Sequence, residues 1–254
     1  MIPKEYLNKT INHHHTSFDI IKNHRGTINT FNKYNGKIRF LWLTNNTKEQ
    51  AEKYGLKNNT FIYNPNRIKS NELADIKNNK KLITIARLSK AKRIDLMIDI
   101  VKEIFKDKKY KDWTLEIFGL GGIEDELKKQ INNHKQIKLM GLTNDPKKEY
   151  LSSSINLCTS EFEGFCLSII EAYECGVPTI TTNYGEPTTE VVNSNIGIIA
   201  KNKEDYINNL KELMDNTQKR EEFAKKGKQF VEKFQIDNII KEWIKLFDKV
   251  DKGE

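Results

Sequence analysis

The stretch NLCTSEFEGFCLSIIEAYECGVPTITTNYGEPTTEVV, residues 156–192, decides how the rest of this chain is interpreted. An apolar run from Ile155 to Thr159 predicts a buried strand at its start. A loop carrying Glu163 follows, and we expect a helix to begin at Gly164-Phe165. That helix is expected to end at Cys175-Gly176, where a glycine suits the cap.

A second unit of the same kind follows directly. Val177 to Thr181 is another short apolar run, and Gly185-Glu186-Pro187 predicts the start of a further helix, because proline is tolerated in a first helical turn. Two successive strand–loop–helix units indicate a parallel sheet. A ligand of such a sheet is expected beyond the carboxyl ends of its strands.

The loop before the first of these helices has the features of a diphosphate site. Gly164 lets the backbone approach a ligand, and the free N–H groups of a helix that begins there would point at an anion. Glu171 lies eight residues after Glu163, so the two carboxylates would reach different parts of one bound molecule. The spacing alone leaves open that both are solvated surface residues.

A second pair of charged residues would complete this site. Arg87 and Lys92 lie five residues apart in the loop between a predicted strand, Lys81 to Ala86, and its helix. Two cations there could clamp a pyrophosphate and neutralise the charge that grows as it leaves. In a lysine-rich chain, two solvated cations remain the alternative.

Three segments, in order, resemble a known enzyme family. EFEGFCLSIIEAYECGVPTITTNYGEP (161–187) resembles the E-x7-E segment of retaining GT-B glycosyltransferases of the family-four (group 1) type. IARLSKAKRIDLMIDIVKEI (85–104) and WTLEIFGLGGIEDELKKQI (113–131) resemble two further segments of that family. The resemblance implies an α/β fold, a Rossmann-like parallel sheet flanked by helices, with a small N-terminal α/β remnant.

The same resemblance implies roles for individual residues. Glu163 would lie near the reacting centre, with Arg87 and Lys92 stabilising the leaving group, and Glu171 would accept hydrogen bonds from ribose hydroxyls. Backbone groups near the donor are expected at Gly119, Leu142, Gly164, Phe165, Cys166 and Leu167. For Gly119 a purely structural turn is an equal alternative. No DxD triplet is present, so the expected reaction needs no cofactor and no metal, and the nucleotide-sugar donor is a substrate.

Residues 1–64 are expected to form an incomplete N-terminal, acceptor-side segment, and residues 1–36 are polar and poorly periodic. Residues 65–234 would be the nucleotide-sugar-binding domain, and 235–254 a C-terminal cross-over helix. That helix should carry one apolar face that covers the N-terminal segment or a partner, or else is left exposed; the face consists of Ile236, Ile239, Ile240, Trp243, Ile244 and Phe247. A complete GT-B enzyme has two domains of similar size, so this chain is expected to be a fragment, an unusually short protein, or one half of a pair.

Composition narrows the remaining classes. The chain has 254 residues, 37% of them hydrophobic, and no apolar run long enough for a transmembrane helix. Its three cysteines lack metal-type spacing and are expected to be reduced cytosolic thiols. The net charge of +8 comes from scattered lysines, which favours peripheral contact with an anionic membrane surface over nucleic-acid binding. Three adjacent histidines, 13–15, cannot all face one metal ion from a regular element.

The sequence thus predicts a cytoplasmic, retaining hexosyltransferase that uses a nucleotide-diphosphate sugar, with a UDP-sugar as the expected donor. The acceptor would be a hydroxyl on a glycan, a lipid or a protein-linked sugar. The alternative is a non-catalytic or partner-dependent subunit that binds a nucleotide sugar or a glycan. The two differ in whether the isolated chain hydrolyses sugar nucleotides.

Overall fold

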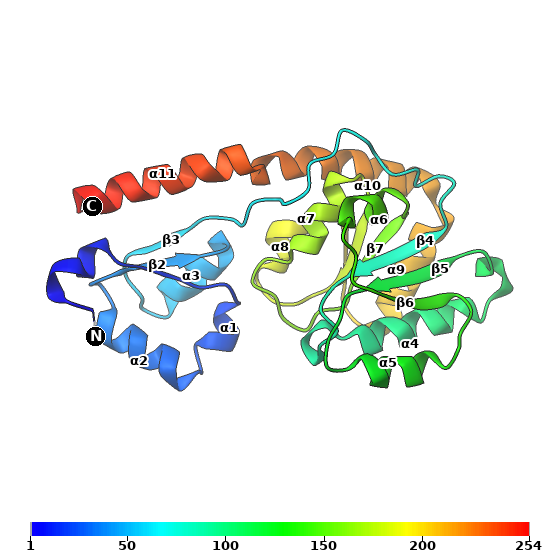
Figure 1. The fold of residues 1–254 in the computed structure, drawn as a ribbon, viewed down its shortest axis with the longest axis horizontal. Coiled ribbons are helices and arrows are strands. Elements are labelled where there is room, and N and C mark those ends of the chain that lie inside the picture. Colours follow the sequence, from blue (N-terminus) through cyan, green and yellow to red (C-terminus); the bar gives the residue numbers. More distant parts are fainter. Residues whose placement is uncertain (1, 254) are drawn as a thin grey trace.

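The computed structural model describes residues 2–253, which form two sheets side by side (Figure 1). The strands within each sheet are parallel. Met1 and Glu254, the outer ends of the first and last expected segments, lie outside the described residues. The N-terminal sheet has three parallel strands in the order β1-β2-β3. Their bounds are Ile11–His13, Arg39–Trp42 and Asn59–Phe61.

The N-terminal segment is more regular than its sequence suggests. It carries the short 3-10 helix η1 and three α-helices, and η1, α1 and α2 lie where the sequence is polar and poorly periodic. Phe18 and Phe31 are buried against Trp42 and supply the core that no periodic pattern indicated, with 5.5 Å between the Phe18 and Trp42 ring centroids. These helices are η1 (Lys4–Lys9), α1 (Phe18–Ile21), α2 (Arg25–Tyr34) and α3 (Asn45–Lys53).

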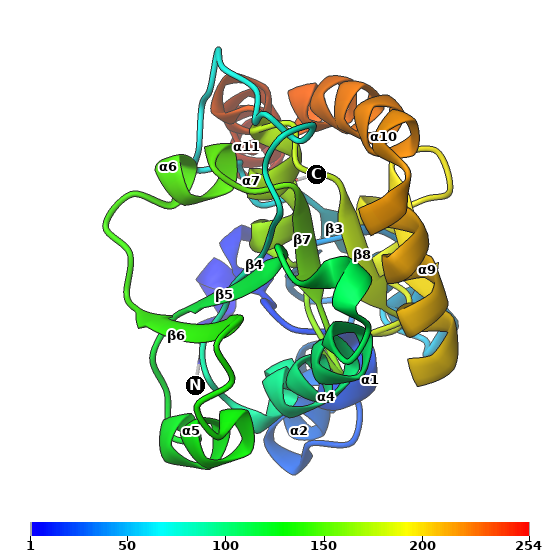
Figure 2. The same ribbon diagram turned by 90° about the vertical axis from the view of Figure 1, so that its right-hand side faces the viewer.

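The second sheet has six parallel strands in the order β6-β5-β4-β7-β8-β9. The order reverses direction between β4 and β7, so the loops after these two strands diverge and leave room for a ligand at the carboxyl edge. Figure 2 shows this sheet with helices on both faces. The strands are β4 (Lys81–Ile85), β5 (Thr114–Phe118), β6 (Ile137–Gly141), β7 (Ile155–Cys158), β8 (Thr179–Thr182) and β9 (Gly197–Ala200).

The helices of the larger sheet follow the predicted alternation, and the predicted α/β class is confirmed. Helix α4 spans Ile94–Phe105 and buries its apolar stripe in the main core. The other α-helices are α5 (Glu124–Ile131), α6 (Pro146–Leu151), α7 (Leu167–Glu174), α8 (Thr188–Val191), α9 (Lys203–Asp215), α10 (Thr217–Phe230) and α11 (Ile236–Lys252). Short 3-10 turns are η2 (Lys90–Lys92), η3 (Lys108–Tyr110) and η4 (Val231–Phe234).

Helix α11 crosses back from the larger sheet to the N-terminal one (Figure 1). Its packed residues are Ile239, Leu246 and Val250, which meet Leu41 and Ile62. The predicted apolar face packs only in part, because the small sheet covers the side that carries Ile239 and leaves four of the six predicted residues exposed. The exposed members are Ile236, Ile240, Ile244 and Phe247.

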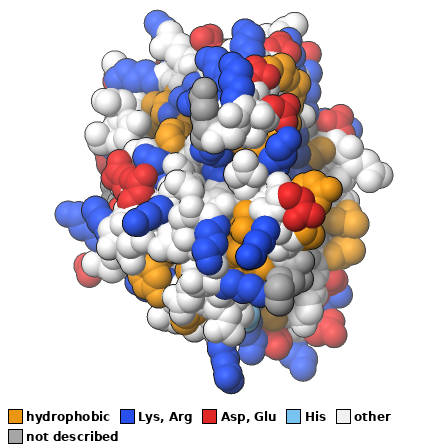
Figure 3. Space-filling model, turned by 90° about the vertical axis from the view of Figure 1, so that its left-hand side faces the viewer, with side chains coloured by type: hydrophobic (Ala, Val, Ile, Leu, Met, Phe, Trp, Pro, Cys, Tyr) orange, Lys and Arg blue, Asp and Glu red, His pale blue; other side chains and the backbone are white. Residues whose placement is uncertain are grey.

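The surface of the described residues carries mixed charge, and their helices are not of the membrane-spanning kind. Within residues 2–253, no helix combines the length and the hydrophobicity needed to cross a lipid bilayer. On the face that presents the N-terminal segment, lysine and arginine side chains are spread among acidic and uncharged ones (Figure 3). This distribution matches the scattered charge of the sequence.

Candidate functional site

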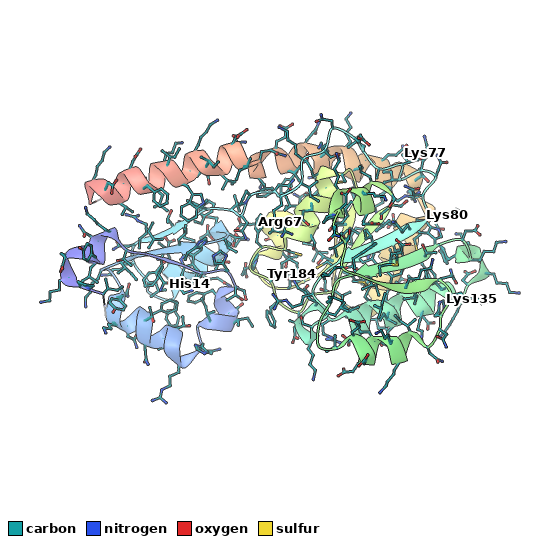
Figure 4. The ribbon with its side chains drawn as sticks, viewed as in Figure 1. His14, Arg67, Lys77, Lys80, Lys135 and Tyr184 are labelled. Atoms are coloured by element: carbon teal, nitrogen blue, oxygen red, sulfur yellow. The ribbon has the colours of Figure 1, made fainter. Side chains whose placement is uncertain are left out.

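A cavity of about 450 Å³ lies where the two sheets face each other. One wall comes from the end of β4 and the loops after β4 and β7, and it includes Arg87, Lys92 and Glu163. The opposite wall comes from the N-terminal segment and the linker, and it includes His15 and Arg67. Figure 4 shows Arg67 at the junction of the two parts. The cavity therefore lies at the carboxyl edge of the large sheet, where the topology places ligands.

Most of the residues singled out from the sequence line this one cavity. They are Arg87, Lys92, Glu163, Gly164, Phe165, Cys166, Leu167 and Glu171. Gly119 and Leu142 are not among its lining residues. Two sequence segments separated by about 70 positions, Arg87–Lys92 and Glu163–Glu171, are thus brought together by the adjacent strands β4 and β7.

Lys92 and Glu163 form an ion pair at the cavity wall. The Lys92 Nζ donates to Glu163 Oε1 in a short hydrogen bond, and Ser160 Oγ donates to the same oxygen at 2.8 Å. Burial disfavours the ammonium form, but the attraction of Glu163 outweighs it, so the pKa of Lys92 is raised. Lys92 is therefore a fixed positive charge. Its three donors leave hydrogens for a second acceptor.

Arg87 differs from Lys92 in having an open environment. It is exposed at the end of β4, and among residues 2–253 it has no carboxylate within ion-pair distance. A guanidinium held at a cavity mouth without a carboxylate partner is available to an anionic ligand. The pair of cations predicted from the sequence thus consists of one fixed charge and one available charge.

Glu171 is buried, with 3% of its side chain exposed, and is held by Arg67. Arg67 Nε and Nη2 lie 2.7 and 2.6 Å from Glu171 Oε1. Burial raises the pKa of Glu171, and the Arg67 charge opposes that shift. Both contacts use Oε1, so the second oxygen keeps its capacity to accept a hydrogen bond from a ligand.

The N-terminus of α7 faces the same cavity. The helix begins at Leu167, two to three residues later than predicted, because Cys166 before it takes a left-handed conformation with φ of 65°. The side chain of the N-cap residue, Cys166, makes no capping hydrogen bond. The first N–H groups of an uncapped helix carry partial positive charge and bind anions.

Gly164 is explained by packing between the two parts of the chain. A Cβ atom at this position would lie 2.4 Å from the backbone carbonyl oxygen of His15. Any side chain would therefore push the N-terminal segment away from the loop that carries Glu163. The glycine allows the two walls of the cavity to approach each other.

Gly119 has a structural role at the turn after β5. Its φ is +137°, and a Cβ atom would lie 1.9 Å from the carbonyl oxygen of Ala86. Leu142 lies nearby, past the end of β6, and is 70% exposed. A nucleotide contact at either residue stays a prediction.

Sequence reasoning missed the polar residues that the N-terminal segment and the linker contribute to the cavity: His15, Asn64 and Arg67. The histidine run was weighed only as a metal site, yet its members diverge. His14 stacks on Trp42 with ring centroids 4.7 Å apart, whereas His15 reaches the cavity. Burial lowers the pKa of His14 to about 4, so this ring is neutral and structural at neutral pH. Only the fold identifies these positions, because their partners lie far away in sequence.

Comparison with known proteins identifies the family. The family model described as "Glycosyl transferases group 1" matches residues 65–230, which is more than half of the chain. An uncharacterized glycosyltransferase of Haemophilus influenzae is 30% identical over 199 residues, covering 76% of this chain and 56% of the relative. The poly(ribitol-phosphate) alpha-N-acetylglucosaminyltransferase of Staphylococcus aureus is 26% identical, covering 92% of this chain and 49% of that protein.

Solved structures agree on the fold. The crystal structure of an S. aureus TarM variant in complex with Fondaparinux, alpha-GlcNAc-glycerol and UDP superposes with a TM-score of 0.80 at 23% identity, covering 93% of this chain and 50% of that one. The chain thus spans about half the length of the curated relatives it matches. The family match confirms the resemblance noted in the sequence, and the chain belongs to the group 1 glycosyltransferase family.

Proposed function

We propose that this chain binds a nucleotide-diphosphate sugar in the 450 Å³ cavity and transfers the sugar, with retention of configuration, to an acceptor hydroxyl. One observation carries the proposal. Arg87, Lys92 and the uncapped N-terminus of α7 all border one cavity at the carboxyl edge of a parallel sheet. That combination supplies positive charge from three directions, which suits a diphosphate.

Each charged residue has a role in the proposed reaction. Arg87 and Lys92 neutralise the diphosphate as the bond to the sugar breaks, and the α7 N–H groups hold its oxygens. Glu163 fixes Lys92 and lies beside the sugar. Glu171, oriented by Arg67, accepts a ribose hydroxyl on its second oxygen. The acceptor hydroxyl attacks from the face that the diphosphate leaves, so no side chain acts as a covalent nucleophile and no metal is required.

A UDP-sugar is the proposed donor. Support comes from the TarM structure, whose complex contains UDP, together with the shared family. Gly119, Phe165, Cys166, Leu167 and Leu142 are proposed to contact the donor through their backbones. The segments 1–64, 65–234 and 235–254 are proposed to be the acceptor side, the donor side and the connecting helix.

The acceptor is proposed to be a glycan or a lipid- or protein-linked sugar that meets the donor at the wall carrying His15 and Asn64. The N-terminal sheet has three strands, and we propose that a further polypeptide shares acceptor binding. The net charge of +8 supports a cytoplasmic site of action with contact to an anionic membrane surface, which cosedimentation with anionic vesicles would test.

The proposal is tested by calorimetric titration of UDP and GDP. Arg87→Ala should weaken UDP binding by roughly 10- to 100-fold, the value of a charge-assisted hydrogen bond. Arg93→Ala is the matched control, because Arg93 lies in the same loop but pairs with Asp95 outside the cavity. Unchanged UDP affinity in the Arg87 variant, or no binding by the unaltered chain, would contradict the assignment. UDP-sugar hydrolysis by the chain then distinguishes a transferase from a binding subunit.

A further inference from the structure

Two cysteines and one glutamate meet at the end of β7. Cys158 is the last residue of that strand, and Cys166 precedes α7. Their Sγ atoms are 3.8 Å apart, and a carboxylate oxygen of Glu163 and both sulfurs lie within 4.8 Å of one another. Among residues 2–253, this is the group of His, Cys, Asp and Glu side chains whose ligand atoms are gathered closely enough to share one metal ion.

The distance between the sulfurs suits a tetrahedral ion. A Zn–S bond is about 2.3 Å, so two thiolates on one tetrahedral Zn²⁺ lie about 3.8 Å apart. The observed separation equals that value without any movement of the backbone. A disulfide would need the sulfurs to close to about 2.05 Å. Without an ion, the Cys158 and Cys166 thiols form one hydrogen bond at this Sγ–Sγ distance.

A hollow and a cation lie beside the same cluster. The hollow, about 10 Å³ in volume, is lined in part by Cys158, Glu163 and Lys92. The Lys92 ammonium already pairs with Glu163. The Glu163 carboxylate therefore already has a cation beside it in the protein.

We propose that Cys158, Cys166 and Glu163 form a binding site for a thiophilic divalent cation, with Zn²⁺ as the reference ion, and that the bound ion blocks the donor cavity. Binding replaces the Lys92–Glu163 ion pair and releases the two thiol protons to solvent, with no change of oxidation state. Water completes the coordination. Because Glu163 and Cys166 also line the donor cavity, ion and donor compete.

The site is tested by titrating the protein with Co²⁺ and Zn²⁺ under a reducing agent that contains no thiol. Thiolate-to-cobalt charge transfer in the near ultraviolet reports sulfur ligation directly, and calorimetry gives the zinc affinity. Cys158→Ala should weaken zinc binding more than about 100-fold, because loss of a ligand exceeds the effect of losing an outer-shell partner. Cys175→Ala is the matched control, because Cys175 is buried elsewhere, at the end of α7.

A second variant tests the proposal with the opposite sign. Lys92→Met removes the cation that competes for Glu163, so zinc should bind about tenfold more tightly. This readout keeps the test decisive if Cys158→Ala fails to fold, which far-ultraviolet circular dichroism would show. Zinc should also raise the apparent Kd for UDP in the unaltered chain.

Several outcomes would overturn the proposal. They are the absence of a thiolate band, equal zinc affinity in the Cys158 and Cys175 variants, and weaker zinc binding in the Lys92 variant. Loss of two free thiols to a disulfide, with no metal bound, would identify the pair as a redox couple instead. Zinc binding is measured without nucleotide, so the result of the zinc titration does not depend on whether the chain binds UDP.

Discussion

Glu190 joins the two parts of the chain, and its removal gives a sharp test of how the cavity is held together. Its Oε2 accepts hydrogen bonds from the Asn45 backbone N–H at 3.1 Å and from the Tyr63 hydroxyl at 2.7 Å. Its other oxygen accepts a short hydrogen bond from the Asn46 N–H. Asn45 is the first residue of α3, so a carboxylate on the large domain caps a helix of the N-terminal segment.

We expect Glu190→Ala to lower the free energy of unfolding by about 2–3 kcal/mol. Hydrogen bonds to a charged acceptor contribute about 1.5–3 kcal/mol each, and a charge at a helix terminus adds about 0.3–1 kcal/mol. The total should stay below the sum of three such bonds, because water can replace the carboxylate at these partly exposed groups. Burial and the nearby Glu190 raise the pKa of Tyr63, so the variant should also titrate this hydroxyl at lower pH.

The matched control is Glu186→Ala, in the loop just before α8, the helix that carries Glu190. The Glu186 side chain is exposed, and the contact of this residue with Asn46 uses its backbone carbonyl, which the substitution keeps. Urea denaturation followed by circular dichroism should show a change within about 0.5 kcal/mol for the control. Equal stability of the Glu186 and Glu190 variants would refute the idea that this carboxylate fastens the two parts.

Three further predictions concern the cavity and its walls. Arg67→Ala leaves the Glu171 carboxylate buried without its cation, so we expect the free energy of unfolding at pH 7 to fall by about 1–3 kcal/mol. The difference from the unaltered chain should shrink on acidification, because the carboxyl becomes protonated. A difference that grows on acidification would contradict this. Gly164→Ala should lower the free energy of unfolding by about 1–3 kcal/mol and weaken UDP binding, because the new methyl group meets the His15 carbonyl. Thermal melting would show the loss of stability, and calorimetry would show the loss of affinity. The pKa of His14 is about 4 in the folded chain, below the ordinary 6.5. Between these two pH values the unfolded chain binds more protons than the folded chain, so the free energy of unfolding falls as the pH drops from 6.5 to 4. His14→Phe should make that fall shallower in urea denaturation at pH 7 and pH 5; an unchanged slope would show that this ring does not titrate on unfolding.

The larger sheet could be predicted from the sequence because its signals are local. Helix α4 has apolar residues at helical spacing over its whole length, which is a local signal. Strand β7, Ile155–Cys158, lies in the apolar run predicted from Ile155 to Thr159. Arg87 and Glu163 were assigned to one site because both follow strands that end at the same edge of the sheet.

The missed features depend on contacts between distant parts of the chain. Arg67 and Glu171 are 104 positions apart, so nothing near Arg67 in the sequence indicates a buried partner. The N-terminal core depends on a few large aromatic residues, among them Phe31, and not on a repeating pattern. The faces of α11 could not be assigned either, because the small sheet covers only the side that carries Ile239.

A crystal structure of the chain with UDP would show whether a diphosphate binds between Arg87 and the N-terminus of α7. We expect diphosphate oxygens within hydrogen-bonding distance of the Arg87 guanidinium, the Lys92 ammonium and the backbone N–H groups that begin α7. UDP bound elsewhere, or a diphosphate in contact with neither Arg87 nor α7, would contradict it.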